Sequence, residues 1–355
     1  MDFKGVEIVC PACRRDLEWI GDSLHCTGCA RRYPVLHGIP DFRLWPDPYI
    51  GIEEDRAKGL KLAAECASLS FEESVRLYYR LTTVVPEFQA NAFTRGLLAA
   101  ADRAAHSLAE WESLDGRPTS GLRLLEIGCG TAPLLAGASP RYDRVAGIDV
   151  AFRWLILARK RLEEAGIDVP LLCACAEALP FPDASFDAVV ADSALEVLRD
   201  QRRGCEQAYR VLAQGGWLFA ATPNRFSLGP DPHAGIWAGG WLPASVVAWW
   251  VRRKGGVPPE RRLLSRRSLV HLLEGAGFAD VRVRVPVIPQ AQREGFSGPL
   301  LAIIDACNAA ARNAAGATIL SAIGPLLHAT ARKPVGSKWP PVQRAAPRAG
   351  SDEVR

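Results

Sequence analysis

An acidic residue, a glycine-rich turn and a second acidic residue have the spacing of a site for a nucleotide-like ligand. Glu126 stands two residues before the run Gly128-Cys129-Gly130, and Asp149 follows 21 positions after Gly128. The glycines allow a tight turn and leave room for a ligand to lie against the backbone. An acid at the position of Asp149 accepts both hydroxyl groups of a ribose in a βαβ unit. The alternative for Asp149 is a surface residue that caps the helix after it.

The residues around these acids predict a strand, a turn and a helix in that order. Residues 122–127 form a short apolar run that the glycines interrupt, and residues 144–149 form a second apolar run. The helix between the two runs starts at Pro133 and is short and irregular, because Gly137 lies within it. Such a unit opens a nucleotide-binding α/β sheet, which holds its ligand at the carboxyl ends of the strands.

The glycine turn distinguishes between two kinds of ligand. A nicotinamide-binding turn carries a third glycine three residues after the second, where this chain has Pro133. Glu126 would repel a pyrophosphate group, but it suits a cationic ligand. S-adenosylmethionine (SAM) carries a sulfonium and an ammonium group and no phosphate. The pattern therefore favours SAM, and an NAD-binding oxidoreductase is the less favoured alternative.

The segment LLEIGCGTAP, followed by VAGIDV, resembles motif I and the second strand of class I SAM-dependent methyltransferases. The likeness is nearest to the type 11 group, which includes the quinone-biosynthesis enzymes. Downstream, CAEALPF resembles that group's D-A-E-x-L-P-F, SFD with VVAD resembles its fourth strand, and YRVL with GGWL resembles its RVLKPGG segment. The departures are Ala132, Cys175 and Val197. The resemblance covers residues 122–223 and implies a domain that binds SAM and transfers its methyl group.

Regular alternation of apolar runs and helical segments over residues 122–333 predicts a parallel sheet with helices on both faces. The expected strands are 122–127, 144–149, 169–174, 186–191, 216–222, a sixth at 278–283 and an antiparallel seventh near 326–332. The fold class is therefore α/β, with a Rossmann-like, seven-stranded and mostly parallel sheet. We expect the SAM-binding residues in the glycine turn and at the carboxyl ends of the strands: Glu126, Gly128, Cys129, Gly130, Asp149, Val150, Cys175, Ala176, Glu177, Asp192 and Ser193.

The resemblance also implies individual roles at this site. Asp149 would bind the ribose, and Val150 with Ala176 would flank the adenine. Cys175 stands where relatives place an acid toward the adenine amino group. Because a thiol accepts hydrogen bonds poorly, either the backbone of Cys175 or Glu177 would take that role.

Four cysteines near the N-terminus have the spacing of a zinc ribbon. Cys10 and Cys13 form one C-x-x-C pair, Cys26 and Cys29 form another, and 12 residues separate the pairs. Two such pairs complete a tetrahedral Zn²⁺ site, and so short a segment needs the metal to hold its fold. A redox motif is the alternative for either pair alone. Four thiolates close the coordination shell, so this zinc would be structural. The segment 1–43 resembles the small zinc ribbons that activate methyltransferases.

A long insertion at about 224–264 follows the fifth strand, at the end of a sheet where lids and substrate surfaces occur. It contains His233, a candidate catalytic residue that would deprotonate a hydroxyl or amine acceptor; an exposed loop histidine is the alternative. Residues 241–254 are apolar, rich in tryptophan and then basic, so they could contact a membrane surface or a lipid-like acceptor. Packing against the protein's own helices is the alternative for this segment.

Composition and length bound the remaining organisation. The chain has 355 residues, 48% of them hydrophobic, and a net charge of +4, which is too small to indicate nucleic-acid binding by itself. It shows no leader sequence and no run of 18 apolar residues, so we expect a cytoplasmic protein with reduced cysteines. The predicted parts are a zinc ribbon at 1–43, a linker and helical lid at 44–121, a methyltransferase domain at 122–333 with insertions at about 224–264 and 299–323, and a disordered tail at 334–355.

These features predict a SAM-dependent methyltransferase that acts by in-line displacement on a small-molecule or lipid-like acceptor. The acceptor atom and the oligomeric state stay open at this stage. RNA is the second candidate acceptor, because basic clusters at 252–254, 261–262 and 266–267 could help a ribbon that binds tRNA or rRNA. Clusters of that size are usually solvated surface, so the small-molecule or lipid-like acceptor is favoured.

Overall fold

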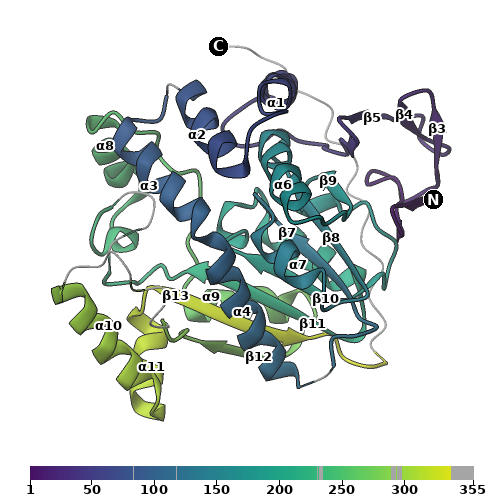
Figure 1. Cartoon of the computed structure of the whole chain (residues 1–355). Coiled ribbons are helices and arrows are strands. Elements are labelled where there is room, and N and C mark those ends of the chain that lie inside the picture. Colours follow the sequence, from purple (N-terminus) through teal and green to yellow (C-terminus); the bar gives the residue numbers. More distant parts are fainter. Residues whose placement is uncertain are drawn as a thin grey trace.

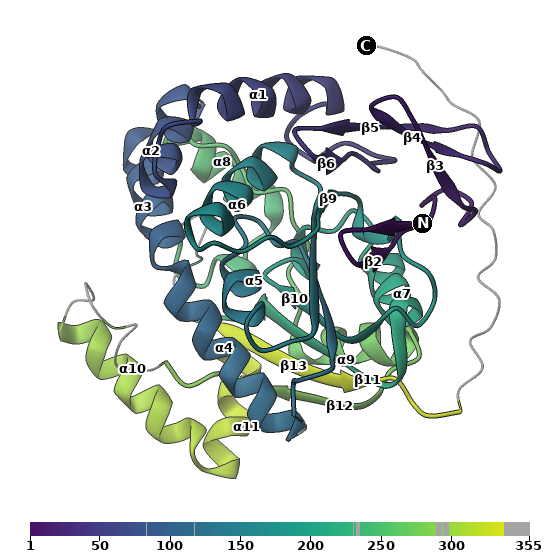
Figure 2. The ribbon, with the colours of Figure 1, turned by 45° about the vertical axis from the view of Figure 1, so that its right-hand side comes forward.

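The chain folds around one central sheet, and a small antiparallel module is attached to one edge of it. A computed structural model describes residues 1–82, 84–116, 118–229, 231, 235–288, 293 and 298–336. His233 and the part of the predicted tail beyond residue 336 lie outside the described residues. The sheet lies at the centre of the molecule with helices on both of its faces (Figures 1 and 2).

The central sheet has seven strands in the order β12-β13-β11-β10-β7-β8-β9. The bounds are β7 Arg123–Ile127, β8 Arg144–Asp149, β9 Leu171–Cys173, β10 Phe186–Asp192, β11 Leu212–Pro223, β12 Ala279–Arg284 and β13 Leu326–Arg332. The neighbours from β11 to β9 pair in parallel, whereas β13 pairs antiparallel with both β11 and β12. This topology confirms the predicted Rossmann-like sheet.

Strand order reverses at β7, and this reversal fixes where a ligand can bind. The chain leaves β7 through β8 and β9 on one side, and it returns to β10 on the other side. The connections on the two sides diverge, so a crevice opens at the carboxyl end of β7. The glycine turn Gly128–Gly130 lies directly after this strand.

Two layers of helices bury the apolar residues of the sheet. One layer contains α5 Pro133–Ala138 and α6 Phe152–Glu164, with α1 Ile52–Glu65, α2 Phe71–Leu81, α3 Glu87–Leu98 and α4 Ala100–Asp115 packed around them. The other contains α7 Gln201–Val211 and α9 Arg266–Gly275. Phe152, Leu155 and Ile156 illustrate the pattern, because spacings of three and four residues put all three on one buried face of α6.

The N-terminal module extends the sheet edge at β9. Strands β3 Leu17–Ile20, β4 Ser23–Cys26, β5 Arg32–Leu36 and β6 Ile39–Pro40 form an antiparallel sheet, preceded by the small pair β1 Asp2–Phe3 and β2 Val6–Glu7. The Phe42 backbone amide donates to the carbonyl of Cys173 at 2.7 Å, and the Val9 amide donates to the carbonyl of Pro180 at 3.0 Å. The module is therefore joined by backbone hydrogen bonds to the strand that ends at the crevice (Figure 2).

Both predicted insertions contain helices. The first holds α8 Ala244–Arg253, beside α2 and α3 in Figure 1. The second consists of α10 Gly298–Ala311 and α11 Ala314–Ile323, which pack on each other next to β12. In the described part of the chain, none of the helices combines the length and the apolar character that crossing a bilayer requires.

Close packing under the glycine turn gives a test of the fold. Gly147 in β8 has no side chain, and a Cβ there would overlap Leu135 Cδ1 and lie 3.0 Å from Cys129 Sγ. We predict that Gly147→Ala lowers the free energy of unfolding by about 2 kcal/mol, measured by urea denaturation, because this core cannot expand cheaply. Gly137→Ala is the control, since a Cβ at Gly137 meets no atom within 4 Å and alanine favours a helix. Equal stability of the two variants would contradict this packing.

Candidate functional site

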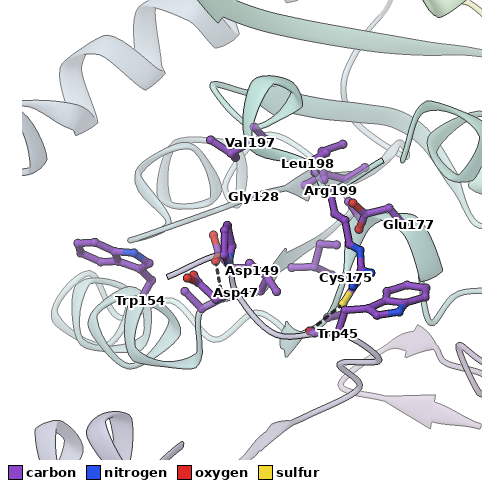
Figure 3. A pocket seen from close by; sticks show the side chains of 18 of the residues that line it. Trp45, Asp47, Gly128, Asp149, Trp154, Cys175, Glu177, Val197, Leu198 and Arg199 are labelled. Carbon is purple, nitrogen blue, oxygen red and sulfur yellow. Dashed lines mark hydrogen bonds between the residues drawn. The ribbon is translucent and has the colours of Figure 1, made fainter. Parts of the chain in front are cut away.

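A cavity of about 690 Å³ lies at the carboxyl ends of β7, β8, β9 and β10, and we call it the central cleft. Figure 3 shows that its walls come from the sheet, from residues after the N-terminal module and from the loop after β10. Most of the predicted SAM-binding residues line it: Gly128, Gly130, Asp149, Val150, Cys175, Ala176, Glu177 and Ser193. The remaining three lie beside it rather than in its lining: Glu126, Cys129 and Asp192.

The glycine turn and Asp149 hold each other in place. The backbone amides of Gly128 and Cys129 both donate to the carbonyl of Ile148, at 2.8 and 2.9 Å. The Gly130 amide donates to Asp149 Oδ2 at 2.9 Å, and the Ala151 amide donates to Asp149 Oδ1 at 2.8 Å. Each carboxylate oxygen keeps lone pairs for a further donor, so Asp149 can accept a ligand's hydroxyl groups from this fixed position.

The turn needs glycine where it approaches the opposite loop. Gly128 has a φ of +73°, and a Cβ there would lie 2.7 Å from Ala194 Cβ. Four residues on, Ala132 also adopts a left-handed conformation, with a φ of 57°, and it caps α5. Ala132 is one of the three positions at which the sequence departs from the pattern it resembles, and the protein adopts the left-handed backbone there at the cost of some strain.

Buried carboxyl groups surround the base of the glycine turn. Glu126 is fully buried in β7, and its Oε2 has no hydrogen-bond partner among the described residues. Burial raises the pKa of Glu126 well above its ordinary value, and the nearby Asp192 and Asp149 raise it further. Burial also raises the pKa of Asp149 to about 6, although its two backbone hydrogen bonds act in the opposite direction. The local field therefore favours a bound cation.

Glu196 belongs to the same acidic group, and the sequence analysis did not select it. It is buried in the turn after β10, where its carboxylate accepts a hydrogen bond from Thr222 Oγ1 at 3.0 Å. Burial raises the pKa of Glu196 to about 7, and the neighbouring Asp192 contributes to the rise. The motif L-E after the fourth strand is the signal that could have found it.

The cysteines at the cleft are thiols with structural contacts. Burial raises the pKa of both Cys173 and Cys175, so neither is ionised near neutral pH. Cys175 Sγ donates to the carbonyl of Trp45 at 3.4 Å (Figure 3). Glu177 is also held by the protein, because its Oε1 accepts the backbone amide of Asp200 at 3.1 Å. The side chains at these two positions therefore fix the walls of the cleft.

One wall of the central cleft comes from residues that the sequence analysis treated as a linker. Trp45, Asp47 and Tyr49 line it, although they precede the sheet by more than 70 residues. Tyr49 Oη accepts the backbone amide of Glu260 at 2.8 Å, which joins this wall to the insertion after β11. The aromatic and proline-rich run LWPDPY is the signal in the sequence that could have indicated a fixed conformation.

A buried network of ion pairs holds this wall against the sheet, and we call it the Arg43–Arg153 network. Arg43 donates to Asp41 Oδ2 at 2.7 Å, to Asp55 Oδ2 at 2.7 Å and to the carbonyl of Val150 at 3.1 Å. Arg153 donates to Asp55 Oδ1 at 2.7 Å and to Asp47 Oδ2 at 3.2 Å. The network thereby fixes both the cleft wall and the loop after β8.

The four predicted zinc ligands meet in the N-terminal module. The Sγ atoms of Cys10, Cys13, Cys26 and Cys29 all lie within 4.8 Å of one another. Zinc–sulfur bonds of about 2.3 Å in a tetrahedron place neighbouring sulfurs about 3.8 Å apart, which matches this cluster. Cys26 Sγ also accepts the backbone amides of Gly28 and Cys29, at 3.3 and 3.4 Å. The cluster fits a metal ion that four thiolates enclose.

The comparisons with known proteins agree with the geometry of the central cleft. Residues 125–220 match a family model described as a methyltransferase domain. The matched segment begins in β7 and ends in β11, so it contains the strands whose carboxyl ends line the central cleft.

Similar proteins include quinone methyltransferases. A ubiquinone biosynthesis O-methyltransferase of Methylocella silvestris is 32% identical over 166 residues, which are 46% of this chain and 60% of that protein. A demethylmenaquinone methyltransferase of Thermus thermophilus is 39% identical over 98 residues, which are 27% of this chain and 44% of that protein. The chain thus spans less than two thirds of the length of either relative.

A solved structure with a similar fold is that of Haemonchus contortus phosphoethanolamine N-methyltransferase 2 in complex with SAM. Its identity to this chain is 20%, and the superposition has a TM-score of 0.45. It covers 64% of this chain and 52% of the other.

The Arg43–Arg153 network predicts that one substitution, which removes a single buried charge, lowers the stability of the protein strongly. Asp55→Asn leaves two buried guanidinium groups with one carboxylate fewer, so we expect a loss of about 3 kcal/mol in the free energy of unfolding. Urea denaturation measures it. Glu53→Gln in the same helix is the control, because the Glu53 side chain is 82% exposed and its ion pair with Arg56 contributes little. A loss below 1 kcal/mol for Asp55→Asn would contradict the structural importance of the network.

Proposed function

We propose that this protein is a SAM-dependent methyltransferase that acts on a small-molecule or lipid-like acceptor. The observation that carries the proposal is the group of carboxyls at the glycine turn, the buried Glu126 and the half-buried Asp149 and Asp192, whose pKa values are all raised. A sulfonium and an ammonium group would relieve their mutual repulsion, whereas a pyrophosphate would increase it. The cleft therefore supports SAM over a dinucleotide, in agreement with the matched family model.

The residues of the cleft have complementary tasks in such a reaction. SAM supplies a methyl group on a sulfonium, which is a good leaving group. Asp149 would accept the ribose hydroxyls, Val150 and Ala176 would flank the adenine, and the glycine turn would leave room for the ligand's chain. The protein then has to hold donor and acceptor in line and keep water out. Our candidate for removing a proton from the acceptor is His233, which lies outside the described residues.

An apolar acceptor is the best-supported choice. Val197 and Leu198, from the loop after β10, and Trp154, from α6, all line the cleft (Figure 3). The relatives named above act on quinones or their precursors, to judge from their names, and such acceptors are apolar. RNA has less support, because Arg261 of one basic cluster is paired with Asp231 and faces the cleft.

We also propose that Zn²⁺ occupies the cysteine cluster and that the metal has a structural role. The support is the spacing of the four sulfur atoms and the closed shell they form. None of the ten cysteines forms a disulfide bond, which supports a reducing, cytoplasmic location as part of the same proposal. In this division the ribbon at 1–43 precedes a helical segment at 44–121 and a methyltransferase domain at 122–333.

Proton release provides the test of the SAM site. Because Asp149 has a pKa of about 6, a cationic ligand that favours its carboxylate form lowers this pKa and expels a proton. We predict that SAM binds with an affinity that rises as the pH increases from about 5 to 7, and that binding releases protons near pH 6. Calorimetric titration in buffers of different ionisation enthalpy measures both quantities.

Two further titrations make this result specific. Asp149→Asn should weaken SAM binding at least about tenfold and remove part of the proton release. Asp168→Asn is the control, because that carboxylate is 80% exposed and lies at the opposite end of β9 from the cleft. Binding of NADH in place of SAM, or proton uptake on SAM binding, would overturn the proposal.

The metal proposal predicts a coupled loss of zinc and of SAM affinity. The purified protein should contain one zinc per chain by mass spectrometry, and the double variant Cys26→Ser, Cys29→Ser should contain none. Since residues 41–49 run directly from the ribbon into the cleft wall, we expect SAM binding to weaken at least about tenfold in this variant. Cys307→Ser is the control, because Cys307 lies outside the cluster. Full zinc content in the double variant would refute the assigned ligands.

A further inference from the structure

Large apolar side chains are concentrated on the surface of the first insertion. Six of them fall within residues 237–250, and single exposed apolar residues elsewhere need no explanation. Their exposed fractions are Trp237 59%, Trp241 55%, Leu242 42%, Val246 43%, Trp249 57% and Trp250 39%. Four tryptophans in contact with solvent over such a short stretch indicate a surface that something else covers.

The helix α8 presents much of this surface on one side. Val246, Trp249 and Trp250 all lie within α8, with Trp249 three and Trp250 four residues after Val246, so these exposed side chains share a helical face. Val251 lies on the other side and is 2% exposed, so it anchors α8 to the protein. The outward tryptophans are therefore presented by a fixed helix rather than by a loose loop.

Basic side chains border the apolar surface. Arg252, Arg253 and Lys254 end the helix, and residues 235–259 contain no acidic residue. The Arg253 guanidinium lies 5.7 Å from the ring centre of Trp249, and Lys254 Nζ lies 4.7 Å from that of Trp250. Cations and aromatic rings thus share the same edge of the surface.

We propose that residues 237–254 form a peripheral docking surface for lipid bilayers that contain anionic lipid. Tryptophan favours the headgroup level of a bilayer, where its ring is apolar and its N–H can reach water or phosphate. Arginine and lysine next to it attract anionic headgroups, by about fivefold in affinity for each cation. A second copy of the chain is a poorer occupant, because two-fold symmetry would place two sets of these cations close together.

The position of α8 relative to the central cleft gives this surface a use. Only six residues separate Arg253 from Glu260, and residues 260–262 line the cleft. The hydrogen bond from the Glu260 amide to Tyr49 Oη ties that segment to the cleft wall. Docking would therefore bring the cleft near the lipid. The idea that the protein takes a lipid-like acceptor from the bilayer rests on the proposed function. The binding of the protein to the bilayer does not depend on that function.

Co-sedimentation of the full-length protein with vesicles tests the proposal. We expect binding to phosphatidylcholine vesicles that contain about 30 mol% phosphatidylglycerol, and at least about tenfold weaker binding to phosphatidylcholine alone or at high salt. The double variant Trp249→Ser, Trp250→Ser should lose at least about tenfold in affinity on the anionic vesicles. The double variant Arg253→Glu, Lys254→Glu should lose the preference for anionic lipid.

Matched controls separate this surface from general stickiness. Trp19→Ser removes another exposed tryptophan, 48% exposed in the N-terminal module, and should leave vesicle binding unchanged. Arg266→Glu with Arg267→Glu reverses an exposed basic pair at the start of α9 and should also have little effect. SAM titration of every variant should give the wild-type affinity, because none of these residues lines the central cleft.

Three results would overturn the proposal. The first is equal vesicle binding by the wild type and the Trp249→Ser, Trp250→Ser variant. The second is an equal loss in the Trp19→Ser control. The third is sedimentation of the wild type as a dimer that the tryptophan substitutions dissociate, with no vesicle binding, because the surface would then join two copies. A protein that binds vesicles but not SAM would refute the proposed function alone.

Discussion

The Arg43–Arg153 network is the interaction on which the central cleft depends. Two arginines and three aspartates meet there, and their side chains are at most 8% exposed. Arg56 adds a third cation, because it donates to Asp41 Oδ2 at 2.8 Å. Three arginines therefore balance the charge of the three aspartates. A buried ion pair contributes little net stability, because desolvation offsets its attraction, but removing one partner is costly. The network therefore acts mainly as a geometric constraint that admits one arrangement of the wall.

That constraint explains how the small N-terminal module can influence a distant site. Arg43 bonds to the Val150 carbonyl, and the Phe152 amide donates to Asp55 Oδ2 at 2.7 Å, so both ends of the turn after β8 are held. Asp149 lies at the start of this turn, and its two backbone hydrogen bonds require the turn to keep its shape. The Phe42 amide also bonds to Cys173 in β9, and Cys173 is the pairing partner of Asp149, so the end of β8 is held from the side of the N-terminal module as well. The N-terminal module, the cleft wall and Asp149 thus form one mechanical unit.

Local patterns in the sequence were sufficient for the sheet and the cysteine cluster. The apolar run at 144–149 ends on an acid, and the strand that forms there has those bounds. The antiparallel strand also has the bounds predicted for it, 326–332. The wall of the cleft was not predictable, because it depends on pairs distant in sequence: Arg153 lies 106 residues from Asp47. No periodicity marks such a contact, and a run with two prolines was therefore treated as a linker. Glu126, which the sequence assigns to the SAM site, lies in a central strand, where it is buried beside the lining of the cleft.

The charges of the protein are divided between two places in a way that suits an apolar substrate. The glycine turn concentrates carboxyl groups, whereas the end of α8 concentrates cations, and the segment 255–262 connects the two. A cationic ligand would neutralise the first group, and an anionic surface would neutralise the second. The lining of the cleft places the apolar side chains of Trp154, Val197 and Leu198 beside charged ones such as Arg199 and Arg262, so an acceptor can contact both kinds. An acceptor with an apolar tail and one reactive polar group would then meet little desolvation cost on its way to the cleft.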